Sequence, residues 1–412
     1  MATRCGWLML TTGIAAAVIV QAAPPQPKPD AVGMSSERLT RIHEMVMTKV
    51  KEGAITGAVT AVSRKGRVVH FEAHGVMDLE SKKPMTKDAL FHLASTSKPV
   101  TAVAILILME EGKLLLTDPV SKFIPEFKEM KVALEVTGGG TTKVAAERQI
   151  TILDLLTHTS GLGAGGAANA EFQAVMKTRQ PADTLATFIP KLAGVPLDYQ
   201  PGTRWRYSGL AGFDTLGRIV EVASGMKFDE FLRTRLFEPL GMTSTWFNVP
   251  ESEAVRKVTI YRRTASGLEK PPARISIGGP NYPSGAGGLT STAGDYLRFA
   301  QMLCNGGTLD GKRILSPWTV ELMMSNQVGD LFNGQIGRSS KGVGFGLGGE
   351  VVLNAAEARL RKPNGSYGWD GAFGTYWYVN RKEQIATILF IQTPGRAIHF
   401  DFDNAVAQAV IE

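Results

Sequence analysis

The sequence predicts an α/β protein in which one sheet, built from both ends of the chain, is interrupted by a long and mostly helical insertion. Runs rich in β-branched residues favour strands. They are confined to the two ends of the chain: 58–63, 68–73, 344–353, 375–380 and 384–392. Between about residues 90 and 330, helical and irregular segments dominate. Strands at both ends with helices between them favour one sheet domain closed by the two termini.

The elements near the two ends have clear local patterns. The first is an amphipathic helix that begins at Ser35, and Gly53 is placed to end it. Its apolar residues recur every three or four positions: Leu39, Ile42, Val46 and Val50. The segment Arg64-Lys65-Gly66 then joins the first two strand runs and predicts a hairpin. Residues 402–411 are again helical in pattern.

The composition is that of a folded protein with a large core. The chain has 412 residues, of which 44% are hydrophobic and 20% charged, and disorder is therefore excluded. We divide it into a signal peptide, a spacer, a sheet domain made of two segments, and a mostly helical domain that carries the candidate active-site helix: residues 1–22, 23–34, 35–90 with 330–412, and 91–329.

The net charge of +7 does not indicate a nucleic-acid partner. Forty-five basic residues face 38 acidic ones. The basic residues are scattered, and their tightest clusters are pairs such as Arg262-Arg263 and Arg361-Lys362. Proteins that bind nucleic acid usually gather such charge into a patch. We therefore expect a mildly basic enzyme surface.

The first 22 residues have the parts of an export signal. Arg4 supplies a positive charge, residues 7–20 are mostly apolar, and Val20-Gln21-Ala22 resembles the small-x-small pattern before a cleavage point. We expect an exported protein, periplasmic or secreted, with no stable membrane association after cleavage. An uncleaved anchor is the alternative. Cleavage leaves Cys304 as the one cysteine, so no intrachain disulfide is expected.

Ser95 and Lys98 directly precede the most apolar helix of the chain. Their spacing brings hydroxyl and ammonium groups to one helix face. Of residues 100–109 only Thr101 is polar, so this helix must lie in the core. Ser95 then lies at a helix N-terminus, where free amides favour developing negative charge, and a desolvated Lys98 can act as a base. A capping serine with a surface lysine is the alternative on spacing alone.

The same Ser-x-x-Lys pattern recurs at Ser224 and Lys227 in another context. Ser224 comes at the end of an amphipathic segment, 210–223, and Gly225 is in the position of a helix C-cap. That context offers no N-terminal amides. We interpret Ser224 as a linker residue.

Tyr207 is the second candidate for the site. It precedes Ser208, a helix cap, and lies at the kind of element end where catalytic groups are often found. A rim tyrosine with a packed ring and a wet hydroxyl is the alternative. In the helix that follows, Asp214 is expected outside the buried stripe. A stretch rich in Gly, Pro and Ser, 282–288, is expected to form a loop.

The third candidate is a glycine-rich segment that ends in the strand 375–380. Gly371 permits close approach of the backbone to a ligand. The amide of Ala372 can donate to an oxyanion, and Trp369 lies beside it in the sequence. The flanking glycines suggest that the side chain of Asp370 points to the surface.

In this order, the three motifs resemble the signatures of the serine β-lactamase and penicillin-recognising superfamily: Ser95-x-x-Lys98, Tyr207-Ser208 and Trp369-Asp370-Gly371. Three further stretches are similar to its class C-like branch: 155–162, 287–292 and 345–348. The resemblance covers roughly residues 35–400. It implies a β-lactamase/transpeptidase-like fold, in which an antiparallel sheet flanked by helices joins a mostly helical domain, with the active site between them.

Two departures from the family pattern bear on the substrate. β-Lactamases of this branch carry Tyr-x-Asn and Lys-Thr-Gly at the second and third motifs, but here Gly209 and Trp369 stand in place of the asparagine and the lysine. The amide and the cation that bind a β-lactam are therefore missing. Tryptophan-x-glycine at the third motif resembles family VIII carboxylesterases, and some related acyltransferases and amide hydrolases.

Other chemistries find no support in the sequence. The G-x-S-x-G turn of α/β-hydrolases is absent. By its likeness to the family, His158 is a structural residue held by neighbouring backbone and hydroxyls. The six histidines lack H-E-x-x-H or similar spacing, so no metal is expected, and the mechanism requires no cofactor.

The resemblance implies a serine carboxylesterase that cleaves small-molecule, short-chain esters through an acyl-enzyme on Ser95. Lys98 and Tyr207 share the role of base, and the backbone amides of Ser95 and Ala372 hold the oxyanion, with Trp369 and Gly371 lining the substrate site. A β-lactamase or D-Ala-D-Ala carboxypeptidase, an acyltransferase or amide hydrolase, and a non-catalytic binding or sensory protein are the alternatives. The intact serine, lysine and tyrosine argue against the last.

Overall fold

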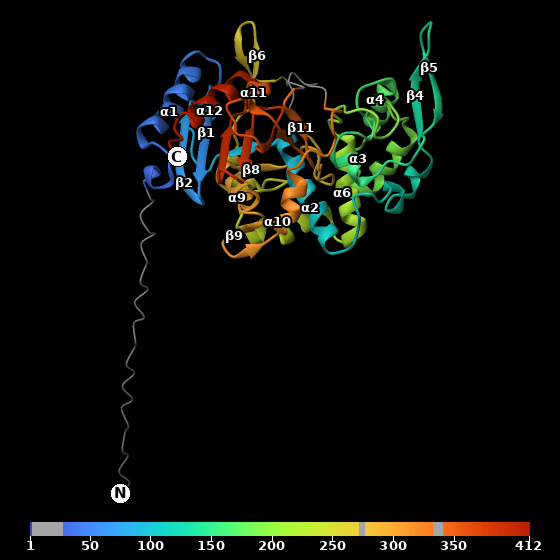
Figure 1. Ribbon diagram of the computed structural model, residues 1–412, viewed down its shortest axis with the longest axis horizontal. Coiled ribbons are helices and arrows are strands. Elements are labelled where there is room, and N and C mark those ends of the chain that lie inside the picture. The colour runs from blue at the N-terminus through green and yellow to red at the C-terminus, as the bar shows by residue number, and fades with distance from the viewer. Residues whose placement is uncertain (2–27, 272–276, 333–340) are drawn as a thin grey trace.

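One seven-stranded antiparallel sheet joins the two ends of the chain (Figure 1). The computed structural model describes residue 1 and residues 28–271, 277–332 and 341–412. The strand order is β11-β12-β13-β14-β15-β1-β2, so the first strand of the chain pairs with the last. The strands are β1 (Gly57–Arg64), β2 (Arg67–Gly75), β11 (Val343–Phe345), β12 (Glu350–Val352), β13 (Tyr367–Asp370), β14 (Tyr376–Asn380) and β15 (Ile385–Phe390). The predicted fold class is confirmed.

Helices cover both faces of this sheet because successive strand residues point to opposite sides. Ala58 of β1 belongs to an apolar cluster shared with α1 (Ser36–Lys51) and α12 (Ala397–Ala407). Val59, the next residue, belongs to the cluster that contains the buried side of α9 (Ala293–Cys304). The result is a layered arrangement in which α1 and α12 lie side by side against one face of the sheet (Figure 1).

The most deeply buried helix is α2 (Ser97–Glu110), whose residues from Ser97 to Leu108 are all buried. It packs against α6 (Ala211–Ser224) within the insertion. The other α-helices are α3 (Ile152–Leu156), α4 (Asn169–Lys177), α5 (Leu185–Phe188), α7 (Phe228–Leu232), α8 (Glu238–Leu240), α10 (Pro317–Met323) and α11 (Ala355–Ala358). The single-turn helices are η1 (Pro29–Val32), η2 (Ala94–Thr96), η3 (Val120–Lys122), η4 (Pro125–Glu129), η5 (Ile189–Gly194), η7 (Glu251–Arg256) and the π-helical η6 (Arg233–Phe237). The burial of α2 along its length confirms the burial expected for the helix after Ser95.

Short strands occur where the sequence predicts helical or irregular structure. Four pairs lie in the insertion: β3 (Leu90–His92) with β8 (Thr290–Thr292), β4 (Lys131–Glu135) with β5 (Thr141–Ala145), β6 (Arg262–Thr264) with β7 (Gly267–Glu269), and β9 (Thr308–Leu309) with β10 (Lys312–Arg313). The predicted strand 344–353 is two strands, because Gly348, with φ +84°, turns the chain between β11 and β12. The strands of two or three residues among them are too short to show a two-residue period.

The segment before α1 packs against the rest of the protein through its last residues. Met34, inside the range expected to be a spacer, is buried and forms a β-bridge with Val410. The expected signal, 1–22, lies outside the described residues apart from Met1. In the part of the chain that the structure describes, no helix is both long and apolar enough to cross a membrane. The domain division stays a prediction, although α9, which lies in the range assigned to the helical domain, contacts the sheet.

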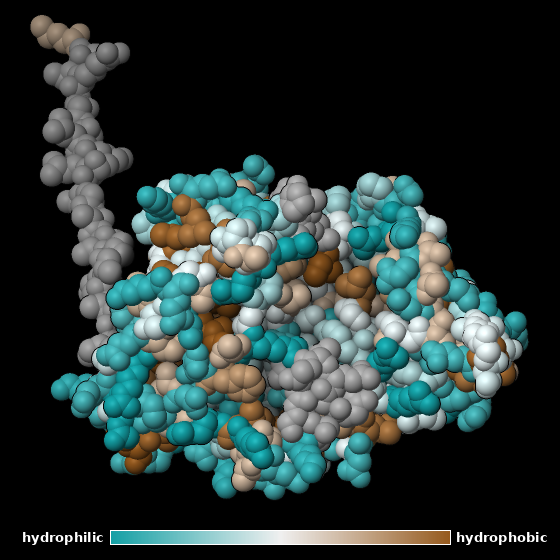
Figure 2. All heavy atoms as spheres, turned by 90° about the horizontal axis from the view of Figure 1, so that it is seen from above, coloured by the Kyte–Doolittle hydropathy of each residue, from teal (hydrophilic) through white to brown (hydrophobic). Residues whose placement is uncertain are grey.

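Hydrophilic side chains are spread over the face of the molecule drawn in Figure 2, with only small apolar areas between them. This distribution agrees with the scattered charge in the sequence.

Candidate active site

Ser95 lies where the chain passes from β3 into α2. It belongs to the single turn η2, which leads directly into the buried helix. Ala94, just before it, has φ of +47°, a left-handed conformation that costs a non-glycine residue about 1–3 kcal/mol. The Ala94 amide donates to Nδ1 of His92 at 3.2 Å, which helps to hold this turn. The strained turn presents the half-buried Ser95 hydroxyl at the start of α2.

Lys98 is completely buried, and its ammonium group makes three hydrogen bonds. Nζ lies 3.1 Å from Oγ of Ser95, 2.9 Å from the carbonyl oxygen of Gly209 and 2.7 Å from that of Ala286. Nζ also lies 5.0 Å from the centre of the Tyr207 ring. An ammonium group has three N–H donors, so these acceptors hold Nζ in one place beside the serine.

Tyr207 is the second side chain in contact with Ser95. Its hydroxyl donates to Oγ of Ser95 at 2.7 Å. The tyrosine ring lies 4.6 Å from that of His158 and 5.6 Å from that of Trp369, measured between ring centres. Among the described residues, the Ser95 hydroxyl thus has two side-chain partners, Tyr207 and Lys98. The structure brings together the three side chains that the first two motifs predicted.

His158 holds the backbone on both sides of Tyr207. Its Nδ1 accepts from the amide of Ser208 at 3.2 Å, and its carbonyl accepts from the amide of Arg206 at 3.1 Å. Burial lowers the pKa of His158 well below its ordinary value, and the charge of Lys98 adds to this effect. His158 is thus a neutral acceptor behind the tyrosine. The expected hydroxyl partner is found on its backbone, where the Tyr199 hydroxyl donates to the carbonyl oxygen of His158 at 3.0 Å. The imidazole Nε2 lies among aromatic rings and has no hydrogen bond in the described part of the chain.

Asp214 is buried, so the expectation that it lies outside the helix stripe is wrong. Its carboxylate accepts from the Tyr282 hydroxyl at 3.0 Å, the Ser284 hydroxyl at 2.6 Å and the Ala286 amide at 3.0 Å. Burial raises its pKa, while these hydrogen bonds act in the opposite direction. Because the Ala286 carbonyl holds Nζ of Lys98, Asp214 positions the lysine through the loop 282–288.

This positioning role of Asp214 was not expected, although the sequence carries a signal for its burial. Asp214 lies four residues after Leu210 and three before Gly217, and both spacings put it on the apolar side of α6. The added Cβ of any residue at 217 would lie 3.2 Å from side-chain carbons of Leu185 and Phe228. Such a close approach leaves no solvent on that side of the helix.

The third motif lies at the end of β13, against the segment that leads to Ser95. A Cβ at Gly371 would lie 2.2 Å from the carbonyl oxygen of Leu93, so only glycine fits there. The Thr375 hydroxyl donates to the same carbonyl at 2.8 Å. Trp369 is buried against Tyr207, and Ala372, one residue past Gly371, is exposed. The oxyanion role of the Ala372 amide stays a prediction.

Asp370 does not point to the surface as expected. Its carboxylate is buried, and Oδ2 lies 3.2 Å from Nε of Arg396. Flanking glycines were a poor guide, because alternation along β13 places Asp370 on the opposite face from Trp369. That face is covered by α12, which begins one residue after Arg396.

A cavity of about 660 Å³ lies close to the serine segment. His92, which binds the Ala94 amide, forms part of its wall, together with Gly288, two residues beyond Ala286. Apolar and polar side chains both contribute, among them Phe247, Tyr282 and Thr290. A cavity of this size can accept a small organic molecule.

Comparisons with known proteins agree with this geometry. The family model described as Beta-lactamase matches residues 42–410. Protein Rv1367c of Mycobacterium tuberculosis is 35% identical over 356 residues, covering 82% of this chain and 86% of its own. Esterase EstB of Burkholderia gladioli is 30% identical over 411 residues, covering 93% and 97%. A solved structure, EstCE1, a hydrolase with promiscuous acyltransferase activity, is 28% identical with a TM-score of 0.77, and covers 90% of this chain and 99% of its own. The resemblance predicted from the motifs is confirmed.

Proposed function

Because the chain belongs to the β-lactamase family of serine hydrolases, we propose that it is a carboxylesterase that cleaves short-chain esters through an acyl-enzyme on Ser95. One observation carries the proposal. The Ser95 hydroxyl lies within hydrogen-bond distance of Lys98 and Tyr207 at the start of a buried helix. The similarity to the esterase EstB along nearly the whole chain supports an ester as the substrate.

In the acylation step, Oγ of Ser95 forms a bond to the ester carbonyl carbon as its O–H bond breaks. The proton passes to the Lys98–Tyr207 pair, which must first have lost one proton to solvent so that either the lysine nitrogen or the tyrosine oxygen is free to accept; these atoms lie 3.1 and 2.7 Å from Oγ. The pair then gives the proton to the leaving alkoxide, which departs as an alcohol. The amides of Ser95 and Ala372 are the proposed donors to the carbonyl oxygen while it carries negative charge.

The deacylation step uses the same groups in reverse. The Lys98–Tyr207 pair takes a proton from water, the hydroxide oxygen bonds to the acyl carbon, and the proton returns to Oγ as the acid leaves. An alcohol in place of water gives a new ester. Because EstCE1 is a hydrolase with promiscuous acyltransferase activity, its similarity to this chain favours such a transfer as a second candidate activity.

The surroundings of Ser95 suit an uncharged ester better than a β-lactam. Trp369 places an apolar ring beside Tyr207, and Gly209 offers a carbonyl already bound by Lys98. These two positions therefore supply neither a cation for the β-lactam carboxylate nor an amide for its side chain. The missing charge-assisted hydrogen bond to the carboxylate is worth about 1.5–3 kcal/mol, and the missing neutral hydrogen bond to the amide about 0.5–1.5 kcal/mol. The two losses together weaken transition-state binding of a β-lactam about 30- to 2,000-fold.

A substrate panel on the purified mature protein tests the proposal. It includes p-nitrophenyl esters with acyl chains from C2 to C12, a chromogenic cephalosporin and a D-Ala-D-Ala peptide. We expect the acetate or butyrate ester to have the highest kcat/KM. A higher kcat/KM for the cephalosporin or the peptide would replace the esterase assignment with the corresponding alternative.

We also propose that the protein is exported and released from its signal after Ala22, which rests on the pattern of residues 1–22. Intact-mass analysis of protein from a secretory bacterial host tests this. The expected species begins at or near Ala23. A full-length chain extracted only with detergent would show an uncleaved anchor instead.

A further inference from the structure

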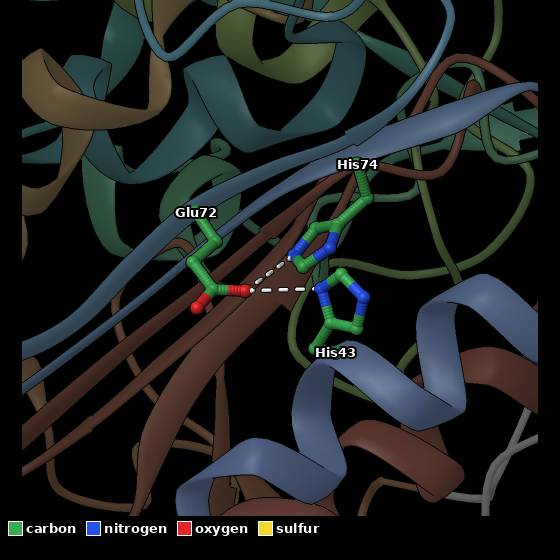
Figure 3. Close-up of side chains that lie close together, drawn as sticks. All are labelled: His43, Glu72 and His74. Atoms are coloured by element: carbon green, nitrogen blue, oxygen red, sulfur yellow. Dashed lines mark ion pairs between the residues drawn. The ribbon is translucent and has the colours of Figure 1, made fainter.

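Three side chains that can bind a metal ion meet outside the catalytic centre, between α1 and β2 (Figure 3). His43 comes from α1. Glu72 and His74 come from alternate positions of β2, so both point to the same side of the sheet, the side on which α1 lies. The histidines are 31 positions apart in the sequence, on two different elements, and for this reason no metal-binding spacing was found there.

The ligand atoms are close enough to share one ion. Nδ1 of His43 lies 3.3 Å from Oε2 of Glu72, and Nε2 of His74 lies 3.9 Å from the same oxygen. All three atoms lie within 4.8 Å of one another. In a four-coordinate zinc site with bonds of about 2.0–2.2 Å, neighbouring ligand atoms lie about 3.3–3.6 Å apart. The distance from His43 to Glu72 already fits this range, and the distance from His74 to Glu72 exceeds it by a few tenths of an ångström. The two histidine nitrogens, which lie within 4.8 Å of each other, approach by up to about 1.2 Å, which a rotation of the exposed His43 side chain supplies.

Of the three ligands, one is buried and the other two are accessible to solvent. The His74 side chain is completely buried, whereas those of His43 and Glu72 are 55% and 45% exposed. An ion can therefore enter from solvent, and water can complete its coordination.

The bond that His74 now makes can be given up without leaving the Thr60 hydroxyl unpaired. Nε2 of His74 lies 2.9 Å from the Thr60 hydroxyl, which also lies 2.7 Å from Nε2 of His70. Thr60 is the residue of β1 that pairs with Glu72. If the lone pair of His74 turns to an ion, the Thr60 hydroxyl keeps His70 as its partner.

We propose that His43, Glu72 and His74 form a binding site for a divalent transition-metal ion of the zinc type. Two imidazoles and one carboxylate suit zinc and similar ions, whereas magnesium and calcium prefer all-oxygen ligands. The ion ties α1 to β2, which is one of the two edge strands of the sheet. Its role is therefore structural, and the chemistry at Ser95 does not involve it.

Calorimetric titration of tag-free, chelator-treated protein with zinc chloride tests the site, with magnesium chloride as a second titrant. We expect one zinc ion per chain and no magnesium binding. H43A and E72Q should each weaken zinc binding at least tenfold. Both side chains are exposed, so these variants should fold. E44Q is the matched control, because Glu44 is exposed but leaves the helix from a different side than His43.

A second measurement is independent of stoichiometry. Zinc should raise the thermal unfolding midpoint of the wild type and of E44Q, but not that of H43A. The proposal is overturned if the wild type binds zinc no better than magnesium, or if H43A and E72Q bind zinc as tightly as the wild type.

Discussion

Two Ser-x-x-Lys sequences in this chain lie at opposite ends of helices, and only one of them forms a reactive arrangement. Ser95 lies before α2, where its Oγ receives hydrogen bonds from Lys98 and Tyr207. Ser224 is the last residue of α6, where its Oγ donates to the carbonyl of Val220 at 2.6 Å. The same spacing thus places one hydroxyl between a lysine and a tyrosine, and the other on its own helix backbone.

The two lysines differ as much as the two serines. Lys98 is completely buried and held by carbonyl oxygens from two other segments, whereas Lys227 is exposed. A helix N-terminus presents free amides to a developing negative charge, and a helix C-terminus presents carbonyls, which repel it. Helix position and burial therefore decide which of two equal patterns can carry an acyl-enzyme. Ser224 is the last residue of a helix rather than a linker residue, but Gly225 is the expected C-cap and no N-terminal amides face the serine.

The largest expected effect separates the two serines. Ser95→Ala should lower kcat for p-nitrophenyl butyrate by about 10⁴- to 10⁶-fold, as removal of a nucleophile does in other serine hydrolases. Ser224→Ala should stay within about twofold of the wild type, since its hydroxyl bonds only to nearby backbone. Steady-state rates with matched circular dichroism spectra decide this. Comparable activity in both variants would show that Ser95 is not the nucleophile.

Replacing the lysines should give the next largest difference. Lys98→Met removes a group proposed to accept the serine proton, and general base catalysis is worth about 10²- to 10⁴-fold. Lys227→Met changes an exposed side chain and should leave kcat unaltered. Mass spectrometry after mixing with ester adds a second measure, because the acyl-enzyme of Lys98→Met should form more slowly. If both variants retain full activity, Tyr207 alone is the base.

A smaller loss is expected from Asp214→Asn. The asparagine has one oxygen for the three donors that the carboxylate now binds, so the loop carrying the Ala286 carbonyl should shift. Loss of a hydrogen bond to a charged group costs about 1.5–3 kcal/mol, or about 10- to 100-fold in kcat. Asp229→Asn, on the exposed side of α7, is the control. An unchanged kcat at a temperature where the variant is folded would show that Lys98 does not depend on this loop.

The smallest predicted effect concerns stability in acid. Burial lowers the pKa of His158 well below 6.5, and burial lowers that of His92 to about 4. Below pH 6.5 the unfolded chain binds these protons and the folded chain does not, so the free energy of unfolding falls as the pH is lowered. Each histidine contributes at most about 1.4 kcal/mol per pH unit in that window. Urea denaturation at pH 7, 6 and 5 measures it, and a constant midpoint would contradict the burial of both rings.

Local patterns predicted the long elements of the fold and not the short ones. In α1, apolar residues recur every three or four positions along a helix of sixteen residues. In α2, apolar residues lie on all sides of the helix, so both patterns are unambiguous. By contrast, β5 is exposed along its whole length and shows no apolar face. Its pairing with β4 depends on a partner strand rather than on its own composition.

In the candidate site, likewise, contacts within one helical turn could be predicted and contacts between distant segments could not. Ser95 and Lys98 could be paired from the sequence because residues three apart lie on one side of a helical turn. Tyr207 could be predicted only from the order of the three motifs, because it lies 112 positions from Ser95, its hydrogen-bond partner. The carbonyl of Ala286 carries no side-chain signature at all, so the sequence could not indicate its bond to Lys98.

The amino-acid sequence by itself determined which side chains are present for acyl transfer, the buried helix that carries them, and the β-lactamase-like fold. Only the tertiary structure decided that Asp214 holds the loop behind Lys98, and that His43 meets Glu72 and His74. The physical reason is the range of the interactions. Contacts within a helical turn follow from backbone geometry, whereas the bond from Lys98 to Ala286 joins residues 188 positions apart, and it forms only when separate elements pack together.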